Sequence, residues 1–449
     1  MSGRKKDIDR ARMAAARVVH AVAFESAFSN ESAAYHLASP DLDARDRAFA
    51  SALIFGTLSN RPLIDYYLSR ASSRSLDKLD KWVITILRTG VWQLFFSYHV
   101  PQRSAVDESV KLARFFVGER ATGFVNAVMR GLIRRKPPLS EDSGRALTCG
   151  LTPELFEMLS EWYGEDQAAA IGHCSLLPPD CVPVRMNALR RKAFLEWASG
   201  DEARALGVRK LDWPDAAYGI EPAGHNVTRL QPYRDGLFSL QSQSAMLVGS
   251  LSGVSADDRV LDLCAAPGGK ITHIAELKGN DRGLTACDIS EERLRSLDDL
   301  SRRLGFSAIE RRCLDAADHH EAFDSSFDIV LCDVPCTGLG LLQRRPEIRS
   351  RVTRETAGRL LPIQRAILRN GSRAVVPGGV LMYSTCTINP AENEDQIRDF
   401  LGSCEGKAFE AEHITTGLPS SSRMPGTLLL LPHLAGSDGF FIARLRRKA

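Results

Sequence analysis

The sequence predicts a multidomain protein with an all-α N-terminal domain, a small α+β module and a C-terminal α/β domain of the Rossmann-like type. With 449 residues the chain exceeds what one ordinary core accommodates. Apolar residues recur at helical spacing until Pro137-Pro138, and short β-runs alternate with helical stretches after residue 236. We therefore expect domains at residues 1–138, 139–235 and 236–449.

The N-terminal domain is predicted from two apolar helical stripes and from its charge. The first stripe runs from Val83 to Phe95, and the second runs from Phe124 to Ile133 and ends in the basic cluster Arg134-Arg135-Lys136. Residues 1–140 contain 22 Lys and Arg against 13 Asp and Glu, a surplus of +9, so a total of +3 leaves −6 for the remainder. This asymmetry favours a polyanion-binding module, although an arginine-rich solvated surface explains the charge equally well.

The middle of the chain has the pattern of a small α+β module that binds RNA or links two domains. Residues 153–163 predict a helix with Thr152 as its N-cap. Residues 182–187 alternate between apolar and other side chains, as a strand does.

The C-terminal domain is predicted from four strands. They span residues 259–263, 283–288, 327–333 and 379–384, and helical stretches separate them. This alternation indicates a parallel sheet with helices on both faces.

Composition narrows the class of protein. Hydrophobic residues make up 44% and charged residues 25%, and no run of about 18 apolar residues predicts a membrane span. The basic N-terminus lacks the apolar stretch of a secretory signal, which favours a cytoplasmic protein. None of the ten cysteines forms a C-x2-C pair, and His319-His320 has no cysteine at zinc-finger spacing, so we expect no metal site. A monomer is the default expectation.

A cofactor site is expected where the first strand of the C-terminal domain ends. The turn C-A-A-P-G-G-K follows that strand and opens a helix, so its backbone can approach a ligand. Asp288 ends the second strand, where it can reach the ribose hydroxyls of a nucleoside cofactor. Asp315 lies past the third strand position, where we expect the adenine end of such a cofactor. A nicotinamide enzyme is the weaker interpretation, because the turn lacks the G-x-G-x-x-G spacing.

Two cysteines follow neighbouring strands at the same edge. Cys336 comes after Asp333, and Cys386 ends the next strand. Either cysteine alone is more typical of a packed core, but the pair beside an acid and a cofactor turn indicates chemistry. Methylation of cytosine at C5 needs a thiolate that adds to C6, a hydrogen-bonding group at the N3/N4 edge and a base for the C5 proton. Asp333 suits the edge contact, and the two cysteines suit the other roles.

The strings LDLCAAPGGK, DVPCTGLG and YSTCTINPAENE resemble the motifs of the RNA cytosine-C5 methyltransferases, and most closely the bacterial 16S rRNA branch called RsmB, Fmu or Sun. VPQRSAVDESVKLAR and GFVNAVMRGLIRR resemble the NusB-like helical RNA-binding domain of that family, GLFSLQSQSAMLV the lead-in to its catalytic domain, and SDGFFIARL its last strands. Ile271 and Thr387 replace the more usual threonine and serine, and neither change removes a chemically essential group.

The resemblance implies S-adenosylmethionine as the cofactor, Cys386 as the nucleophile and Cys336 as the group that assists product release. DNA cytosine methyltransferases use a Pro-Cys nucleophile, so reversed roles are the alternative. The implied cofactor-binding residues are Cys264, Ala265, Ala266, Pro267, Gly268, Gly269, Lys270, Asp288, Asp315 and Asp333.

The substrate implied by the resemblance is small-subunit rRNA. Arg344, Arg345 and Arg349 follow the Cys336 motif and could grip phosphates, while a solvated helical face is the structural alternative. A transfer RNA cytosine-C5 methyltransferase and an RNA-binding assembly factor that holds S-adenosylmethionine without using it are the other hypotheses. The presence of both cysteines argues against the second. A protein methyltransferase is less favoured, because transfer to nitrogen requires no covalent thiol.

Overall fold

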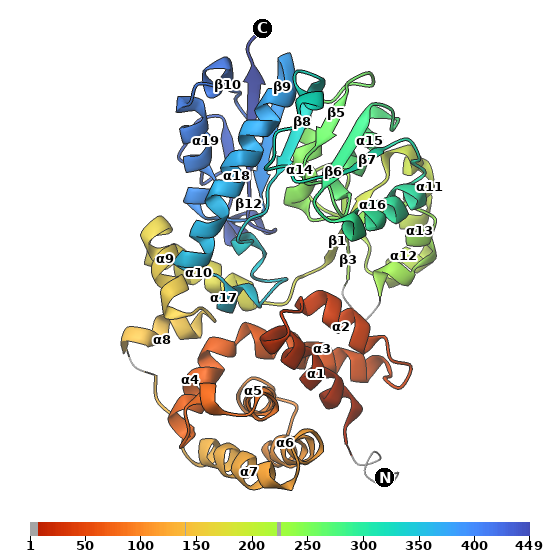
Figure 1. Cartoon of the computed structure of the whole chain (residues 1–449). Helices are drawn as coiled ribbons and strands as arrows, with labels where there is room; N and C mark the ends of the chain where they lie inside the picture. The colour runs from red at the N-terminus through yellow and green to blue at the C-terminus, as the bar shows by residue number, and fades with distance from the viewer. Residues whose placement is uncertain (1–7, 140, 222–225) are drawn as a thin grey trace. The chain divides into compact units, whose positions relative to one another are not determined.

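The computed structural model describes residues 8–139, 141–221 and 226–449 (Figure 1). The chain folds into two compact units. One unit contains residues 1–178 together with residues 342–353, and the other contains residues 179–341 together with residues 354–449. Among the described residues, no helix combines the length and apolar character that a bilayer crossing requires.

The first unit is helical, as the sequence predicts. Its longer helices are α1 (Arg10–Phe24), α2 (Ser29–Leu37), α3 (Ala44–Ser59), α4 (Arg61–Ala71), α5 (Lys81–Phe95), α6 (Gln102–Phe116), α7 (Glu119–Arg134), α8 (Glu141–Thr148), α9 (Pro153–Tyr163) and α10 (Glu165–Leu176). A 3-10 turn, η2 (Leu76–Lys78), precedes α5, and α17 (Ile348–Arg351) lies in the later segment. The predicted N-cap is confirmed, because Thr152 Oγ1 accepts a hydrogen bond of 3.2 Å from the Leu155 amide.

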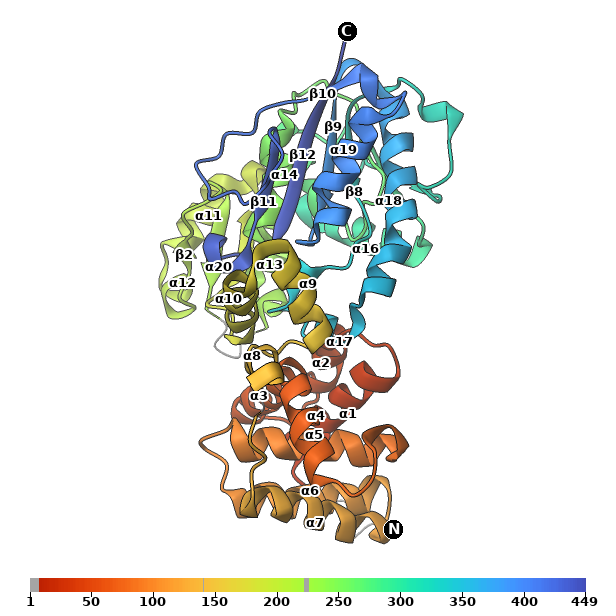
Figure 2. The same cartoon turned by 90° about the vertical axis from the view of Figure 1, so that its left-hand side faces the viewer.

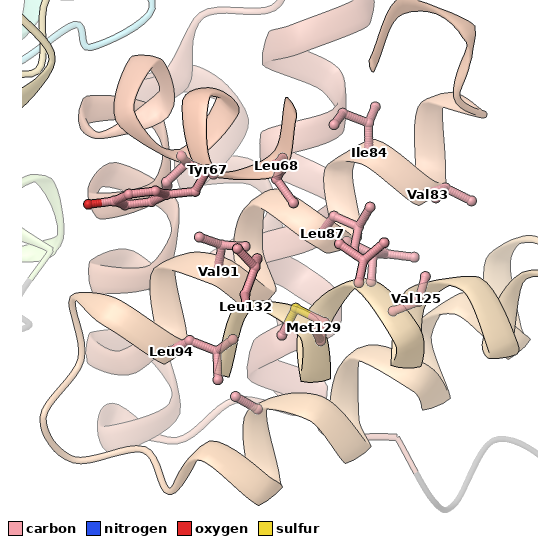
Figure 3. Packing of buried hydrophobic residues seen from close by; sticks show 14 of the residues in the cluster. Tyr67, Leu68, Val83, Ile84, Leu87, Val91, Leu94, Val125, Met129 and Leu132 are labelled. Atoms are coloured by element: carbon pink, nitrogen blue, oxygen red, sulfur yellow. The ribbon is translucent and has the colours of Figure 1, made fainter. Parts of the chain in front are cut away.

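The core of this unit forms around α5. The apolar stripe predicted from the sequence packs against α4, α6 and α7 (Figure 3). Val91, Val125 and Met129 are fully buried there. Burial of such side chains contributes roughly 1.5–3 kcal/mol each, so this stripe supplies much of the stability of the unit.

The segment of residues 342–353 belongs to the helical unit although it follows the Cys336 motif in sequence. Glu347 accepts a hydrogen bond of 3.2 Å from the Ser29 amide. Arg351 donates to the carbonyls of Val22 and Ala27 at 3.1 and 2.7 Å. The chain therefore leaves the second unit after Leu341, is anchored in the helical unit, and returns at Arg354.

The units divide the chain at other places than the predicted domain boundaries. Helices α8 to α10 group with the helical unit up to Pro178, whereas the prediction placed them after residue 138 in the middle module. The strand predicted at residues 182–187 groups with the C-terminal part, so residues 139–235 do not form a separate unit.

The second unit opens with a small antiparallel sheet of order β2-β3-β1-β4. Its strands are β1 (Val182–Met186), β2 (Arg209–Lys210), β3 (Ala217–Ile220) and β4 (Phe238–Leu240). Its helical elements are η3 (Ala188–Arg190), α11 (Arg191–Ala198), α12 (Asp201–Ala205), η4 (Val227–Arg229) and α13 (Gln231–Arg234).

The large sheet has the order β10-β12-β9-β8-β5-β6-β7, with β11 paired to β12. Its strands are β5 (Val260–Asp262), β6 (Leu284–Asp288), β7 (Glu310–Cys313), β8 (Phe327–Asp333), β9 (Val375–Thr385), β10 (Phe409–Ala411), β11 (Thr427–Leu430) and β12 (Phe440–Arg447). The four predicted strands correspond to β5, β6, β8 and β9, and they pair in parallel as predicted. Strands β10, β11 and β12 add antiparallel pairings, which make the sheet mixed.

Helices lie on both faces of this sheet (Figure 2). Helix α14 (Gln243–Ser252) lies on one face, and α18 (Arg354–Ala374) and α19 (Glu394–Gly402) lie on the other. Helices α15 (Gly269–Lys278) and α16 (Glu291–Leu304) pack against β6, and α20 (Pro432–Ala435) follows β11. Short turns η5 (Glu321–Phe323), η6 (Leu339–Leu341), η7 (Pro390–Glu392) and η8 (Gly406–Ala408) complete the unit.

Candidate active site

The carboxyl ends of β5, β8 and β9 bring the predicted site residues to one edge of the sheet. Strand β8 lies between β5 and β9, and Asp333 is in register with Ser384. The Cys336 loop follows β8 directly, and Cys386 follows β9 directly. The predicted strand neighbours are therefore confirmed, and the cofactor turn lies at the same edge as both cysteines.

The turn between β5 and α15 is held by its neighbours on β6. The Ala265 amide donates to the Cys287 carbonyl at 2.7 Å, and the Ala266 amide donates to Asp288 Oδ2 at 3.2 Å. Gly268 has φ +109°, and a Cβ there would lie 2.9 Å from Leu297 Cγ. Only glycine adopts this conformation without strain, so the close approach of the turn to α16 requires it.

A cavity of about 130 Å³ opens beside this turn. Most of the predicted cofactor residues line it: Cys264, Ala265, Ala266, Pro267, Gly269, Lys270 and Asp333. Gln241, Ala245 and Asp262 also line it; they lie in strings that carry the family resemblance but were not predicted as site residues. Gly268, Asp288 and Asp315 are not among the lining residues.

Lys270 and Asp333 form an ion pair at the cavity. Lys270 Nζ lies 2.6 Å from Asp333 Oδ2, and Ser384 Oγ donates to Asp333 Oδ1 at 2.7 Å. Burial by itself lowers the pKa of Lys270, but the charge and hydrogen bond of Asp333 outweigh it, and the net pKa is raised.

Asp262 provides a buried carboxyl group with an unused oxygen. Its side chain is almost completely buried, and Oδ1 accepts a hydrogen bond of 3.3 Å from the Cys264 amide. Oδ2 has no hydrogen-bond partner among the described residues. Burial, followed by the charge of Asp333, raises the pKa of Asp262 to about 7. A cationic donor such as an α-ammonium would satisfy this oxygen and stabilise the ionised form.

Asp288 and Asp315 differ in what surrounds them. Asp288 is buried at the end of β6, where it accepts the Ala266 and Ser290 amides and pairs with Arg293 at 3.3 Å. The next residue, Ile289, is 67% exposed and offers an apolar face beside the turn. Asp315 lies in the exposed loop after β7, where Oδ1 accepts the Ala317 amide at 2.9 Å.

The two cysteine side chains meet. Cys336 Sγ and Cys386 Sγ lie 3.3 Å apart, and both residues are partly exposed. The hydrogen bond with Cys386, and then burial, raise the pKa of the Cys336 thiol well above its ordinary value. Either sulfur can donate in this contact, so the two thiols are close enough to act on the same reacting group.

Three other cysteines of this sheet are poorly suited to act as nucleophiles. Burial raises the pKa of Cys264 well above its usual value, raises the pKa of Cys287 to about 12, and raises that of Cys332 further. Their surroundings disfavour a thiolate.

The expectation for the arginines after Cys336 requires a correction. Arg349 is buried in the helical unit, where its guanidinium donates to the Leu342 carbonyl at 2.6 Å and to the Ser175 carbonyl and hydroxyl at 2.8 and 2.6 Å. Because the Arg349 side chain is buried and its terminal N–H groups donate to these acceptors, it is not available to bind a phosphate. Arg345 is exposed, with its guanidinium 5.3 Å from the centre of the Phe28 ring, and Arg344 is partly buried.

Arg185 is a further residue that was not predicted to belong to the site. It lies on β1 with its side chain fully buried, and its five N–H groups are all used. It pairs with Glu276 through bonds of 2.9 and 2.7 Å, donates to Gln241 and to Thr272 Oγ1, and reaches the Gly269 carbonyl at 2.7 Å. It thereby joins the small sheet to the first turn of α15, the helix that follows the cofactor turn.

No cluster of three or more His, Cys, Asp or Glu side chains suitable for a metal ion occurs within residues 8–139, 141–221 and 226–449.

Two family models match the chain. The family described as 16S rRNA methyltransferase RsmB/F matches residues 251–446, and the NusB family matches residues 9–134.

Relatives match nearly the whole chain. The sequence is 32% identical over 436 residues to the probable ribosomal RNA small subunit methyltransferase B of Bacillus subtilis strain 168, covering 94% of this chain and 95% of the relative. It is 30% identical over 405 residues to the ribosomal RNA small subunit methyltransferase B of Escherichia coli O17:K52:H18 strain UMN026, covering 90% and 91%.

Solved structures share the fold. The crystal structure of PH0851 superposes with a TM-score of 0.84 at 23% identity and covers 98% of this chain and 99% of that one. A methyltransferase homologue from Pyrococcus horikoshii superposes with a TM-score of 0.58 at 25% identity and covers 69% of this chain and 100% of that one.

Proposed function

Since this chain belongs to the RsmB/F family of 16S rRNA methyltransferases, we propose that it methylates C5 of a cytosine in small-subunit rRNA through a covalent adduct between Cys386 and C6. The observation that carries the proposal is the 3.3 Å separation of the Cys336 and Cys386 sulfurs, beside the Lys270–Asp333 pair. Methylation at C5 of cytosine needs a thiolate nucleophile and a base for the C5 proton, and the two thiols can fill these two roles, whereas methylation at nitrogen needs no covalent thiol.

The proposed cofactor is S-adenosylmethionine, which supplies an electrophilic methyl group when it is bound. The residues at the β5 turn suit its chemistry. The unpartnered Oδ2 of Asp262 would accept its ammonium group, and the exposed Ile289 beside Asp288 offers an apolar surface for its base. Asp315, in the exposed loop after β7, would lie nearest the adenine end.

In the proposed mechanism Cys386 attacks C6 of the cytosine as a thiolate, and C5 becomes nucleophilic. Asp333, held by Lys270 and Ser384, would contact the N3/N4 edge of the base and orient it. After C5 has gained the methyl group, a base must remove the C5 proton so that the electrons of that C–H bond expel the Cys386 thiolate.

Cys336 is the proposed base for this proton. Its pKa is raised chiefly by its interaction with Cys386. Once Cys386 is a neutral thioether in the adduct, that interaction no longer disfavours ionisation. Cys336 can then lose its proton to water and accept the one on C5, which makes it available at the step that needs a base.

The helical unit offers a surface for the RNA backbone. A cavity of about 530 Å³ lies between α4 and the end of α7 and includes Tyr66, Arg70 and Arg135 in its lining. Arg70 and Arg135 are exposed, and neither forms an ion pair with any of the residues that the structure describes. Unpaired guanidinium groups around a cavity suit phosphate contacts, so we place RNA anchoring here rather than at Arg349.

The experiment that tests the proposed function is methyl transfer from labelled S-adenosylmethionine to unmodified small-subunit rRNA, followed by nucleoside analysis. We expect the label in 5-methylcytidine, and none with Cys386→Ala, with folding verified by circular dichroism. Label in transfer RNA but not in rRNA would overturn the substrate assignment. Cofactor binding without transfer to either RNA would overturn the enzymatic proposal in favour of an assembly factor.

A further inference from the structure

Glu392 lies between the two cysteine loops and is completely buried. It ends the 3-10 turn η7, six residues after Cys386 in sequence. Within the described part of the chain, no Lys, Arg or His forms an ion pair with it. Burying a carboxylate away from cations is costly unless hydrogen bonds compensate it, so its donors identify what it does.

Four donors surround the carboxylate, two on each oxygen. Oε1 accepts from Thr337 Oγ1 at 2.6 Å and from Asn389 Nδ2 at 2.9 Å. Oε2 accepts from the Thr337 amide at 2.9 Å and from Gln364 Nε2 at 2.9 Å. The same Gln364 amide donates to the Pro335 carbonyl at 2.9 Å. The residues on both sides of Cys336 are therefore fixed to Glu392, directly or through Gln364.

The carboxylate also reaches the Cys386 loop, through a pair of hydroxyl groups. Thr337 Oγ1 and Thr387 Oγ1 lie 2.7 Å apart. The single proton of the Thr337 hydroxyl is directed to Glu392 Oε1, which accepts it. The Thr387 hydroxyl must therefore donate to Thr337, which gives a directed chain from Thr387 through Thr337 to Glu392. Each of these threonines immediately follows one of the two cysteines.

We propose that Glu392 is a positioning residue that holds the Cys336 and Cys386 loops together through Thr337 and Thr387, and so keeps the two sulfurs in reach of the same base. This role in spacing the two sulfurs does not depend on which reaction the protein catalyses. Its consequence for product release rests on the proposed function, since Cys336 must reach C5 while Cys386 is bonded to C6.

Substitutions at Thr387 test the link without removing the buried charge. Thr387→Val keeps the shape but deletes the donor that joins the loops, and it leaves the four donors on Glu392 in place. Thr387→Ser keeps the hydroxyl and serves as the matched control. Glu392→Gln tests the carboxylate itself, because the NH2 group of the new glutamine would lie against groups that also donate hydrogen bonds. The folding of this variant is checked by circular dichroism and thermal unfolding.

The first readout is disulfide formation, which needs neither RNA nor cofactor. Diamide takes two electrons and two protons from the two thiols, which become a disulfide while diamide becomes the hydrazine. The sulfurs must approach to about 2.0 Å, so the rate reports how well the loops hold them together. We expect the Cys336–Cys386 disulfide, measured by mass spectrometry of peptides, to form roughly tenfold more slowly in Thr387→Val and at the wild-type rate in Thr387→Ser. Equal rates in all three proteins would overturn the proposal.

The second readout is the methyl-transfer assay with RNA. We expect Thr387→Val to lower kcat roughly tenfold with an unchanged KM, and to accumulate more protein–RNA adduct than Thr387→Ser. A wild-type protein without transfer activity would refute the proposed function but not the sulfur spacing, which the disulfide rate tests alone. An active wild type with a Thr387→Val variant that matches it in both assays would refute the positioning role.

Discussion

Replacing Arg185 by methionine leaves the Glu276 carboxylate buried without its cation. Both side chains are at most 1% exposed, and two hydrogen bonds of 2.9 and 2.7 Å join them. Removing one partner of such a buried pair costs about 3–5 kcal/mol. The change also removes the hydrogen bond that Arg185 donates to the carbonyl of Gly269, the first residue of α15. We expect the midpoint of urea unfolding, followed by circular dichroism, to fall by about 1 M.

The pH dependence of this loss has a definite sign. Burial raises the pKa of Glu276, although the charge and hydrogen bond of Arg185 oppose the rise. Without Arg185 the pKa rises further, and protonation then favours the folded state. The destabilisation of Arg185→Met should therefore be largest above the folded pKa of Glu276 and shrink as the pH falls through it.

A double variant provides the control for this argument. Arg185→Met combined with Glu276→Leu removes both charges, and we expect it to recover most of the loss. A single variant that loses less than about 1 kcal/mol, or a double variant as unstable as the single one, would contradict a buried ion pair that holds the cofactor helix.

Three further predictions concern ligands and stability. Arg70→Ala with Arg135→Ala should weaken RNA binding in a filter or fluorescence assay about tenfold and reduce the slope of log K against log salt by about 1.5, while cofactor binding stays unchanged. Because burial and Asp333 raise the pKa of Asp262 to about 7, the affinity for S-adenosylmethionine by calorimetry should rise about tenfold from pH 6 to pH 8, and Asp262→Asn should abolish this dependence. Arg349→Leu should destabilise the helical unit by about 2–3 kcal/mol in thermal unfolding, because it leaves buried carbonyls unpaired, whereas Arg345→Ala should leave stability unchanged.

The sequence predicted the strands that carry the site because their signals are local. Strand β8 occupies the predicted residues, and β5, β6 and β9 differ from prediction only at their ends. Once parallel strands are placed side by side, the residues that follow them share an edge. The meeting of Cys336 and Cys386 follows from this rule, as does the position of the cofactor turn.

Residues whose role depends on distant partners could not be predicted. In the sequence Asp262 is one residue of a predicted strand. Its Oδ2 lacks a hydrogen-bond donor because the side chain is buried at the wall of the cavity, and only the folded structure shows this. Arg185 lies 91 positions before Glu276. Glu392 lies in the string YSTCTINPAENE, but its four donors come from Thr337, Gln364 and Asn389, two of which are far away in sequence. Such partners are selected by the fold, and no periodicity encodes them.

Arg349 was placed on the surface because charge in a sequence indicates exposure by default. In the structure, carbonyl groups of Leu342 and Ser175 accept its donors, and this compensation allows it to be buried. Of the three arginines predicted to bind phosphates, Arg349 therefore stabilises the fold instead.

The covalent mechanism is tested most directly by electrophoresis under denaturing conditions after incubation with labelled RNA and S-adenosylmethionine. We predict that Cys336→Ala retains an RNA–protein adduct that survives denaturation, because Cys386 still attacks but the C5 proton is not removed. Cys386→Ala should form no adduct. An adduct in Cys386→Ala and none in Cys336→Ala would reverse the two roles, and no adduct in either variant would contradict covalent catalysis.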